Sequence, residues 1–392
     1  MDILLISVIA VIVIALIFDF TNGFHDAANS VATVVATRAL PAKWAPAFSA
    51  FFNFVAYFVV GTFVANTIAK TVKAEYGGVA LAFAALFAAI AWNYFTWRVG
   101  MPSSSSHAII GGLVGAGIAA GGLDAIDVGS VTKAALGIVI SPAVAFSIAF
   151  LAFYLVLGVQ KATKWHDDHP VFKGAQLVSA AAVSFGHGAN DAQKTMGVIA
   201  ALLLGAGYTD LQDDGSIMVP EWAAFAAYAA IALGTLWGGW KIIETMGLRL
   251  TTLHANSGLA ANIGATTSIF GATSLGVPIS TTHAAASSIV GAGVGSGKGA
   301  NWKVIGEMFT AWVITIPAAG IMGFAMYHLT QLPTIAAWIS VGAVTLLFGI
   351  WAVWAMLHTV HASDIEKEIP GDAELAEPLP GHPHMEGHGP VD

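Results

Sequence analysis

Two polar segments interrupt a chain that is otherwise apolar enough to lie in a membrane. The first runs from Asp19 to Thr37, and a second with a similar pattern runs from Gly188 to Val198. Hydrophobic residues make up 57% of the 392 residues and charged residues only 10%, whereas about 25% is usual for the charged share of soluble proteins. An ionisable or amide group at membrane depth costs several kcal/mol unless a partner, an ion or water satisfies it. A duplicated polar break of this kind is typical of a transporter.

The long apolar runs predict an all-α integral membrane protein with about 10 to 12 transmembrane helices, some of them broken or re-entrant half-helices. The two polar segments align at an offset of 165 residues, which places Asp26 opposite Asp191. A second motif repeats at an offset of 176 residues, where Pro102 and Pro278 are each followed by hydroxyl residues and then by a histidine. Two motifs in the same order predict two homologous halves.

We expect four parts along the chain. They are a first repeat at 1–158, a linker at 159–173, a second repeat at 174–358 and a tail at 359–392. The lysines of the linker predict a cytoplasmic loop, whereas the acidic tail reads as extracytoplasmic. With the middle inside and both ends outside, each half crosses the membrane an odd number of times, so the halves form inverted repeats. The tail is rich in Pro, Glu and Gly, and we expect it to be disordered.

The second motif has the chemistry of an anion site. A proline in the first turn, free backbone N–H groups and hydroxyl donors together make a helix N-terminus that favours negative charge. Two such helix starts, one in each half, could hold a tetrahedral oxyanion between them. The competing interpretation is a pair of ordinary N-capped helices. The candidate anion contacts are Ser104, Ser105, Ser106, Ser280, Thr281 and Thr282.

The first motif supplies the opposite chemistry, because carboxylate and amide oxygens are hard ligands. They suit Na⁺ coordination, proton exchange or a metal already bound to the substrate. The candidate cation ligands are Asn22, Asp26, Asn29, Asn190 and Asp191. Lys194 is a candidate for an anion contact or for a fixed internal cation that pairs with a carboxylate and stabilises the fold. The candidate proton relays are His25, His107, His187 and His283, which could equally be hydrogen-bonded bundle histidines.

The segments Asn22–Ser30 and Gly188–Asp191, with the two Pro-hydroxyl-His runs, make the sequence resemble the PiT family of inorganic phosphate transporters. This resemblance covers roughly residues 1–358. It implies a symporter of inverted repeats that moves phosphate with a cation, with Asp26 and Asp191 as the essential aspartates and the Ser/Thr runs in contact with phosphate. Phe24-His25 and Gln193-Lys194 depart from the sodium-coupled members and resemble the bacterial branch, which implies proton coupling and phosphate taken up as a neutral metal complex.

We therefore expect a multi-pass protein of the plasma (inner) membrane that imports inorganic phosphate by alternating access. The favoured coupling ion is H⁺, Na⁺ stays open, and a divalent metal is a candidate companion of phosphate. The expected partners are phosphate and the lipid bilayer, without nucleic acid; a homo-oligomer stays open. We expect no resident cofactor, no enzymatic activity and no assigned metal ligands. The alternatives are a permease for sulfate or another tetrahedral oxyanion and, less favoured, a metal-dependent membrane enzyme.

Overall fold

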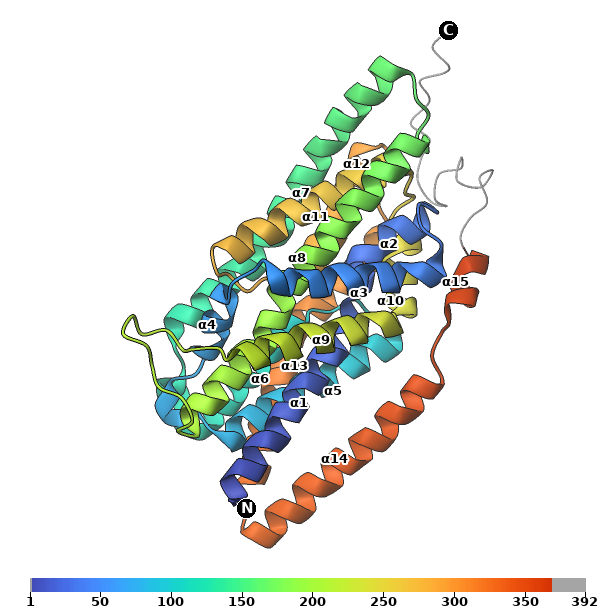
Figure 1. The fold of residues 1–392 in the computed structure, drawn as a ribbon. Helices are drawn as coiled ribbons and strands as arrows, with labels where there is room; N and C mark the ends of the chain where they lie inside the picture. Colours follow the sequence, from blue (N-terminus) through green and yellow to red (C-terminus); the bar gives the residue numbers. More distant parts are fainter. Residues whose placement is uncertain (1, 369–392) are drawn as a thin grey trace.

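The computed structural model describes residues 2–368, and most of these residues lie in helices (Figure 1). The long α-helices are α1 (Ile3–Asp26), α3 (Ala45–Val55), α5 (Val79–Val99), α6 (Ser105–Gly121), α7 (Val128–Thr163), α8 (Pro170–Gly205), α9 (Glu221–Trp237), α11 (Ala255–Ser274), α12 (Thr281–Gly295), α13 (Trp302–Thr330) and α14 (Thr334–Leu357). Shorter helices are α2 (Ala28–Ala36), α4 (Phe63–Ala69), α10 (Trp240–Glu244) and α15 (Ala362–Glu368), with 3₁₀ turns η1 (Ala42–Trp44), η2 (Ala56–Phe58), η3 (Ala74–Tyr76) and η4 (Gly122–Ala125) and a π-helical turn η5 (Thr245–Arg249).

The described helices confirm an all-α membrane architecture. Six of them are long and apolar enough to cross a bilayer, and the number rises to eight if each of two bent pairs forms one span. The bent pairs join 42–58 with 63–69 at 89° and 221–237 with 240–249 at 71°, which are the broken helices that the sequence predicts. The expected total of about 10 to 12 also counted shorter or more polar helices such as α8, α11 and α12.

Helices from the first part of the chain pack against helices from the second part in a reciprocal pattern. Helix α6 packs against α13 while α12 packs against α7, and α1 packs against α9 while α8 packs against α3. In each pair of contacts, a helix of one half meets a helix of the other half. This reciprocal pattern is the one that the predicted repeats would produce, and it brings the two polar segments, on α1 and α8, into the middle of the molecule.

Glycines at repeated positions permit these close helix crossings. A Cβ atom added to Gly23 would lie 2.2 Å from the carbonyl oxygen of Ile231, and one added to Gly188 would lie 2.4 Å from that of Asn53. Small residues let helix backbones approach closely in membrane proteins. The repeated glycine of the polar motif therefore has the same packing role in both halves, against α9 in one and α3 in the other.

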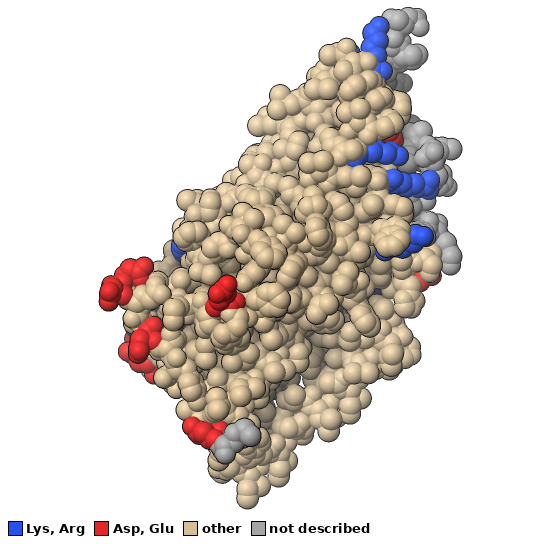
Figure 2. Space-filling model, viewed as in Figure 1, with Lys and Arg blue, Asp and Glu red and all other residues tan. Residues whose placement is uncertain are grey.

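The charged surface is divided between the two ends of the molecule. Figure 2 shows Lys and Arg gathered at the end where α15 lies, with Asp and Glu at the opposite end near the N-terminus of α1. Helix α15 packs against η1 and α10 at the basic end. Basic residues accumulate on the cytoplasmic side of membrane proteins, so the charge pattern favours a cytoplasmic position for α15.

Two expectations for the C-terminal part are wrong. The segment from residue 359 is not wholly disordered, because α15 is helical and Ile365 is buried against its neighbours. Within the described residues, the C-terminal part also does not lie on the side of the N-terminus, because α14 follows α13 and crosses back, so that α15 lies at the opposite end from the start of α1 (Figure 1). The rest of the tail prediction concerns residues 369–392, which lie outside the described residues.

The linker is shorter and more ordered than a loop over 159–173. Helix α7 continues to Thr163 and α8 begins at Pro170, so only 164–169 connects them. Asp168 accepts a hydrogen bond from the backbone N–H of Ala255 at 2.8 Å and lies 2.9 Å from the Nδ1 atom of His254. The linker thereby caps the start of α11, since a carboxylate at a helix N-terminus satisfies free N–H groups.

Candidate functional site

Helices α6 and α12 begin beside the polar segments in matching ways. Ser104 and Ser280 are their N-caps, and each side-chain oxygen accepts a hydrogen bond from the backbone N–H of a histidine, over 3.2 Å from His107 and 3.1 Å from His283. Such a cap satisfies one N–H of the first turn and leaves others free for a ligand. Both serines are predicted anion contacts, and in the structure their side chains cap the two helices.

Asp26 joins the two helix starts. Its Oδ2 atom accepts a hydrogen bond from Ser105 over 3.0 Å, and its Oδ1 atom accepts one from Thr282 over 3.2 Å. The Nδ1 atom of His25 lies 2.6 Å from Asp26 Oδ1, and its Nε2 atom lies 3.0 Å from the hydroxyl of Thr96. Asp26 is the last residue of α1, directly before the short break at Ala27 that separates α1 from α2. A buried carboxylate at a helix break thus contacts both halves of the anion motif.

Asp191 has the equivalent place on α8. Its Oδ2 atom lies 2.9 Å from the ammonium nitrogen of Lys194 and accepts hydrogen bonds from Thr281 over 3.2 Å and from Asn22 over 3.3 Å. The Nε2 atom of His187, one helical turn earlier, lies 3.4 Å from the same oxygen. All five side chains are buried, so these contacts take place away from bulk water.

Asn29 and Lys194 match in the repeat, and each donates to two hydroxyls of a helix start. The Nζ atom of Lys194 lies 2.9 Å from Ser105 Oγ and 3.0 Å from Ser106 Oγ. The amide of Asn29 donates to the two threonine hydroxyls at 281–282 over 3.2 and 3.0 Å. The polar segment of each half therefore holds the helix start of the other half, but only one of the two donors carries a charge.

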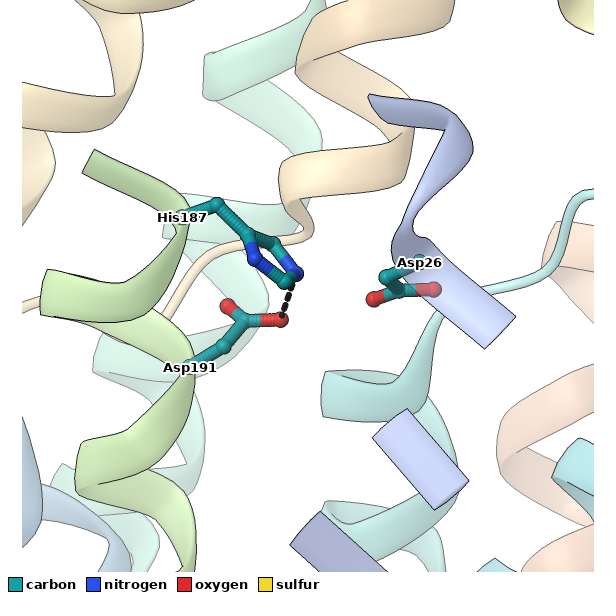
Figure 3. A group of neighbouring side chains, drawn as sticks. All are labelled: Asp26, His187 and Asp191. Carbon is teal, nitrogen blue, oxygen red and sulfur yellow. Dashed lines mark ion pairs between the residues drawn. The ribbon is translucent and has the colours of Figure 1, made fainter. Parts of the chain in front are cut away.

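Figure 3 shows that Asp26, His187 and Asp191 point toward one another from α1 and α8. One ligand atom from each of these residues lies within 4.8 Å of the others. Carboxylate oxygens and an imidazole nitrogen are suitable ligands for a divalent cation. Na⁺ and H⁺ would also be stabilised between two carboxylates.

The protonation of His187 follows from its neighbours. The hydroxyl of Thr235 donates to the carbonyl of Ile231 over 2.9 Å, so it accepts from the Asn53 amide nitrogen at 2.9 Å. This fixes the amide orientation of Asn53, whose oxygen lies 3.2 Å from Nδ1 of His187 and must accept a hydrogen from it. In a neutral imidazole the lone pair then lies on Nε2, which faces Asp191.

Several oxygen atoms around this centre have no hydrogen-bond partner among the described residues. They belong to side chains on α1, α2 and α8, and all are buried. An amide or carboxylate oxygen left in this state is costly unless a ligand or water completes it. The atoms are Oδ1 of Asn22, Asn29, Asn190 and Asp191.

Three predicted site residues have other contacts. Asn190 donates to the hydroxyl of Thr273 over 2.9 Å, which directs its amide nitrogen toward α11. The rings of His107 and His283 lie edge to face with their centroids 4.5 Å apart, and His283 stacks on Trp312 at 3.9 Å. The two histidines pack the helix starts together, and the structure records no hydrogen bond from their rings to either central aspartate within residues 2–368.

Two residues at the site have roles that the sequence reasoning did not assign. Asn53 orients His187, and Thr96 contacts His25, so each polar motif has an orienting partner on another helix. The only signal that the sequence gives for Asn53 is an isolated polar residue in an apolar run. Thr96 gives none, because threonines in membrane helices commonly bond their own backbone.

Comparison with known proteins gives the family. The model of the phosphate transporter family matches residues 22–323, which contain all the side chains of this centre. The chain belongs to the phosphate transporter family. It is thus a multi-pass membrane transporter of the plasma membrane and not an enzyme.

Relatives of this transporter extend over most of its length. A protein of Rhizobium meliloti named "Probable low-affinity inorganic phosphate transporter" is 44% identical over 328 residues, which cover 83% of this chain and 96% of that protein. A protein of Bacillus subtilis with the same name is 41% identical, over 85% of this chain and 99% of its own length. A solved structure described as "The sodium-dependent phosphate transporter" has a TM-score of 0.74 and 26% identity, and the match covers 83% of this chain and 99% of that one.

Proposed function

We propose that this transporter imports inorganic phosphate together with a cation, with H⁺ as the favoured ion, and that the ions bind between Asp26, Asp191 and the starts of α6 and α12. Alternating access would come from movement of one half against the other around this centre. The proposal rests on the contacts of the described side chains, on the family and on the names of the relatives.

The observation that carries cation coupling is the His187–Asp191 contact. The Nδ1–H of His187 is used by Asn53, so a neutral imidazole would present a lone pair to the carboxylate at 3.4 Å. Two lone pairs at that distance repel one another. A proton on Nε2, or a cation between Nε2 and the carboxylate, removes the repulsion. The centre therefore needs a cation, and the protein supplies ligands for it.

Charge balance supports the same conclusion. The centre contains the carboxylates of Asp26 and Asp191 and one ammonium group, that of Lys194, which already pairs with Asp191. Phosphate adds one or two further negative charges at neutral pH. Uncompensated charge in a buried site is strongly unfavourable. Phosphate and a cation should for this reason bind together rather than independently.

The donors and acceptors favour phosphate over sulfate. The hydroxyls and the ammonium of Lys194 can donate to the oxygens of either anion, but Asp26 and Asp191 can only accept when they are ionised. Monohydrogen and dihydrogen phosphate carry protons to donate, whereas sulfate at neutral pH carries none. Sulfate would bring its oxygens against the carboxylates without a hydrogen bond between them.

A divalent metal that enters with phosphate is the second candidate for the companion ion. The convergence of Asp26, His187 and Asp191 within 4.8 Å favours it, because these atoms could bind the metal while the metal binds phosphate. The unpartnered amide oxygens of Asn22 and Asn29 suit Na⁺ equally well, and one structural neighbour is described as sodium-dependent.

The test is uptake of radiolabelled phosphate into proteoliposomes that contain the purified protein. Proton gradient, Na⁺ gradient and divalent metal are varied one at a time, with sulfate as competitor. We expect uptake that follows the proton gradient and is not reduced by excess sulfate. Uptake that requires Na⁺ would show that Na⁺ rather than H⁺ is the coupling ion. Accumulation of sulfate without phosphate would contradict the proposal that phosphate is the substrate.

A further inference from the structure

A third buried carboxylate, Asp19, lies outside the centre described above. It is on α1 and is 0% exposed, and neither of its oxygens has a hydrogen bond of good geometry among residues 2–368, although the side chains of Thr195 and Asn22 lie close enough to interact with it. Asp19, Asn22 and Asp26 follow one another at intervals of three and four residues, so they share one face of the helix. At a rise of about 1.5 Å per residue, Asp19 lies about 10 Å from Asp26 along the helix.

Asp19 lies on the N-terminal side of the centre, and the neighbouring helices supply the groups that act on it. The titratable groups of those helices that interact with it electrostatically are Lys194 and Asp191 on α8 and Tyr228 on α9. Lys194 has its hydrogen bonds with Asp191 and two serines, as described above, and none with Asp19. Asp19 is thus close to the centre without serving as the ion-pair partner of its ammonium group.

A cavity of about 560 Å³ lies between the segment 57–62 and helices α8 and α9, and Tyr228, which interacts electrostatically with Asp19, is part of its lining. The exposed residue Glu221 and the ring of Tyr57 lie at its rim, with the Glu221 carboxylate 3.4 Å from the Tyr57 hydroxyl. Tyr228 and Met196 also line it. Tyr228 is only 2% exposed, and its hydroxyl has no hydrogen-bond partner in the described structure. The same tyrosine therefore lines the cavity and lies beside Asp19.

The position of the cavity fixes its side of the membrane. Its rim includes Glu221, the first residue of α9, and the preceding connection carries Asp210, Asp213 and Asp214. The acidic side chains gather at the end opposite to the lysines and arginines (Figure 2). By the positive-inside rule this end is extracytoplasmic. The cavity is open to the compartment from which protons and phosphate would enter.

A purely structural role does not account for Asp19. A buried ionised carboxylate without a donor costs several kcal/mol, whereas an asparagine or leucine at the same place would avoid that cost. The carboxyl group is stable here when it carries a proton. An isolated acid between an outer cavity and a cation site is the arrangement that a proton path requires.

We propose that Asp19 is the carboxyl group through which coupling protons enter from the outer cavity, with the Tyr228 hydroxyl as the step before it. The hydroxyl gives its proton to the Asp19 carboxylate and takes one from hydronium in the cavity. Asp19 then passes its proton to the cation site between Asp26 and Asp191 and returns to the carboxylate. The proton leaves that site on the cytoplasmic side together with phosphate, so the protein ends the cycle with the number of protons it began with. This inference deepens the proposed function and depends on it.

The test separates phosphate binding from proton coupling in proteoliposomes. Exchange of labelled for unlabelled phosphate at equal pH on both sides needs binding and movement of the site but no net proton flux. Uptake driven by an inward proton gradient needs both. We compare the wild type with Asp19→Asn, Asp19→Glu and Tyr228→Phe, each checked for correct folding by size-exclusion chromatography.

We expect Asp19→Asn to keep exchange and to lose gradient-driven uptake by at least about tenfold, as is usual when a proton-transfer group is removed. Asp19→Glu should restore driven uptake, and Tyr228→Phe should slow it while exchange continues. Full driven uptake in Asp19→Asn would overturn the proposal. Equal loss of exchange and driven uptake in a folded Asp19→Asn protein would also overturn it, because that result indicates a structural role.

The wild type distinguishes this proposal from the proposed function. If the wild type exchanges phosphate but accumulates it only with Na⁺, phosphate transport stands and the proton path of Asp19 is refuted. If the wild type exchanges no phosphate under any condition, the proposed function itself fails, and the role of Asp19 fails with it.

Discussion

At the scale of single residues, matching residues of the two polar segments make different contributions to the charge of the centre. Asn29 and Lys194 hold equivalent hydroxyl pairs, but only Lys194 places a permanent charge there. Its ammonium nitrogen has three oxygen neighbours at 2.9 to 3.0 Å, which resembles the surroundings of a bound cation. One of the two matching positions thus carries a cation on the chain, and the other carries a neutral amide.

The first residue-scale prediction concerns this fixed charge. Lys194→Met leaves Asp191 buried without its ionic partner, and breaking a buried pair in this way costs about 3 to 5 kcal/mol. We expect a lower melting temperature in detergent and no phosphate uptake. The double variant Lys194→Met/Asp191→Asn removes both charges and should regain stability without regaining uptake. An unchanged melting temperature in the single variant would contradict the pairing.

A second residue-scale prediction concerns Asp168 in the linker. Burial raises the pKa of this carboxyl group, but hydrogen bonds from His254 and from the Ala255 N–H more than offset that effect, so its pKa lies below the ordinary value. A lowered pKa in the folded state stabilises the protein above the ordinary pKa of about 4. This contribution is lost as the pH falls through the lower, folded-state pKa.

We therefore expect Asp168→Asn to have a lower melting temperature than the wild type at pH 7, with a difference that shrinks as the pH falls below about 4 and vanishes below the folded-state pKa. The side chain of Asp168 is 32% exposed, so the effect should stay within about 1 kcal/mol. The measurement is thermal unfolding of both proteins across this pH range. A difference that grows toward acid pH would contradict the assignment.

At the scale of elements, the site depends on how closely the helices cross. A Cβ atom added to Gly234 on α9 would lie 2.0 Å from the carbonyl oxygen of Phe20 on α1, directly after Asp19. The α1–α9 crossing therefore has no room for a side chain. Phe20 stands between Asp19 and Asn22 in the chain, so the crossing lies at the polar segment of α1.

We expect Gly234→Val to separate α1 from α9 and to destabilise the protein by about 1 to 3 kcal/mol, the usual cost of overpacking. Phosphate uptake should fall with it. Gly158→Ala on α7 is the matched control, because a Cβ atom there meets nothing within 4 Å. Both variants are measured by thermal unfolding and by uptake. Equal stability of the Gly234 variant and the wild type would show that the crossing is more adaptable than the structure indicates.

At the scale of the whole molecule, the sequence predicts that the polar motifs group together in the interior, as they do in the structure, but it does not predict the single contacts. Asp26 and Asp191 repeat at fixed spacing, and an apolar chain must group such residues in its interior. The same sequence could not show that Ser104 and Ser280 cap helices while Ser105 contacts Asp26. Which hydroxyl points at the centre depends on the rotation of each helix, which packing decides.

The tail shows another limit of the sequence. Its acidic composition suggests disorder and an extracytoplasmic position. In the structure, α14 adds a further crossing after α13, and Ile365 on α15 is buried. Helix α15 has only two apolar residues among seven, and one of them, Ile365, is buried. The amino-acid composition of a segment does not show which single residue is buried against a neighbouring helix.

The orientation of the molecule can be tested because the chain contains no cysteine. We expect Asp213→Cys to react with a membrane-impermeant maleimide added outside intact cells, and Thr163→Cys to react only after the membrane is opened. Both positions are exposed in the structure. The cysteine-free parent protein is the control. The reverse labelling pattern would place the cavity near Asp19 in the cytoplasm and would reverse the proposed direction of proton entry.

The most direct test of the central claim is labelled phosphate uptake by Asp26→Asn and Asp191→Asn in proteoliposomes, compared with equal amounts of inserted wild-type protein. Each change keeps the shape of the side chain but removes a carboxylate from the shared ion site. The account predicts that both variants insert normally and transport phosphate at no more than background level. Uptake at the wild-type rate by either variant would show that phosphate and its cation do not meet between these two aspartates.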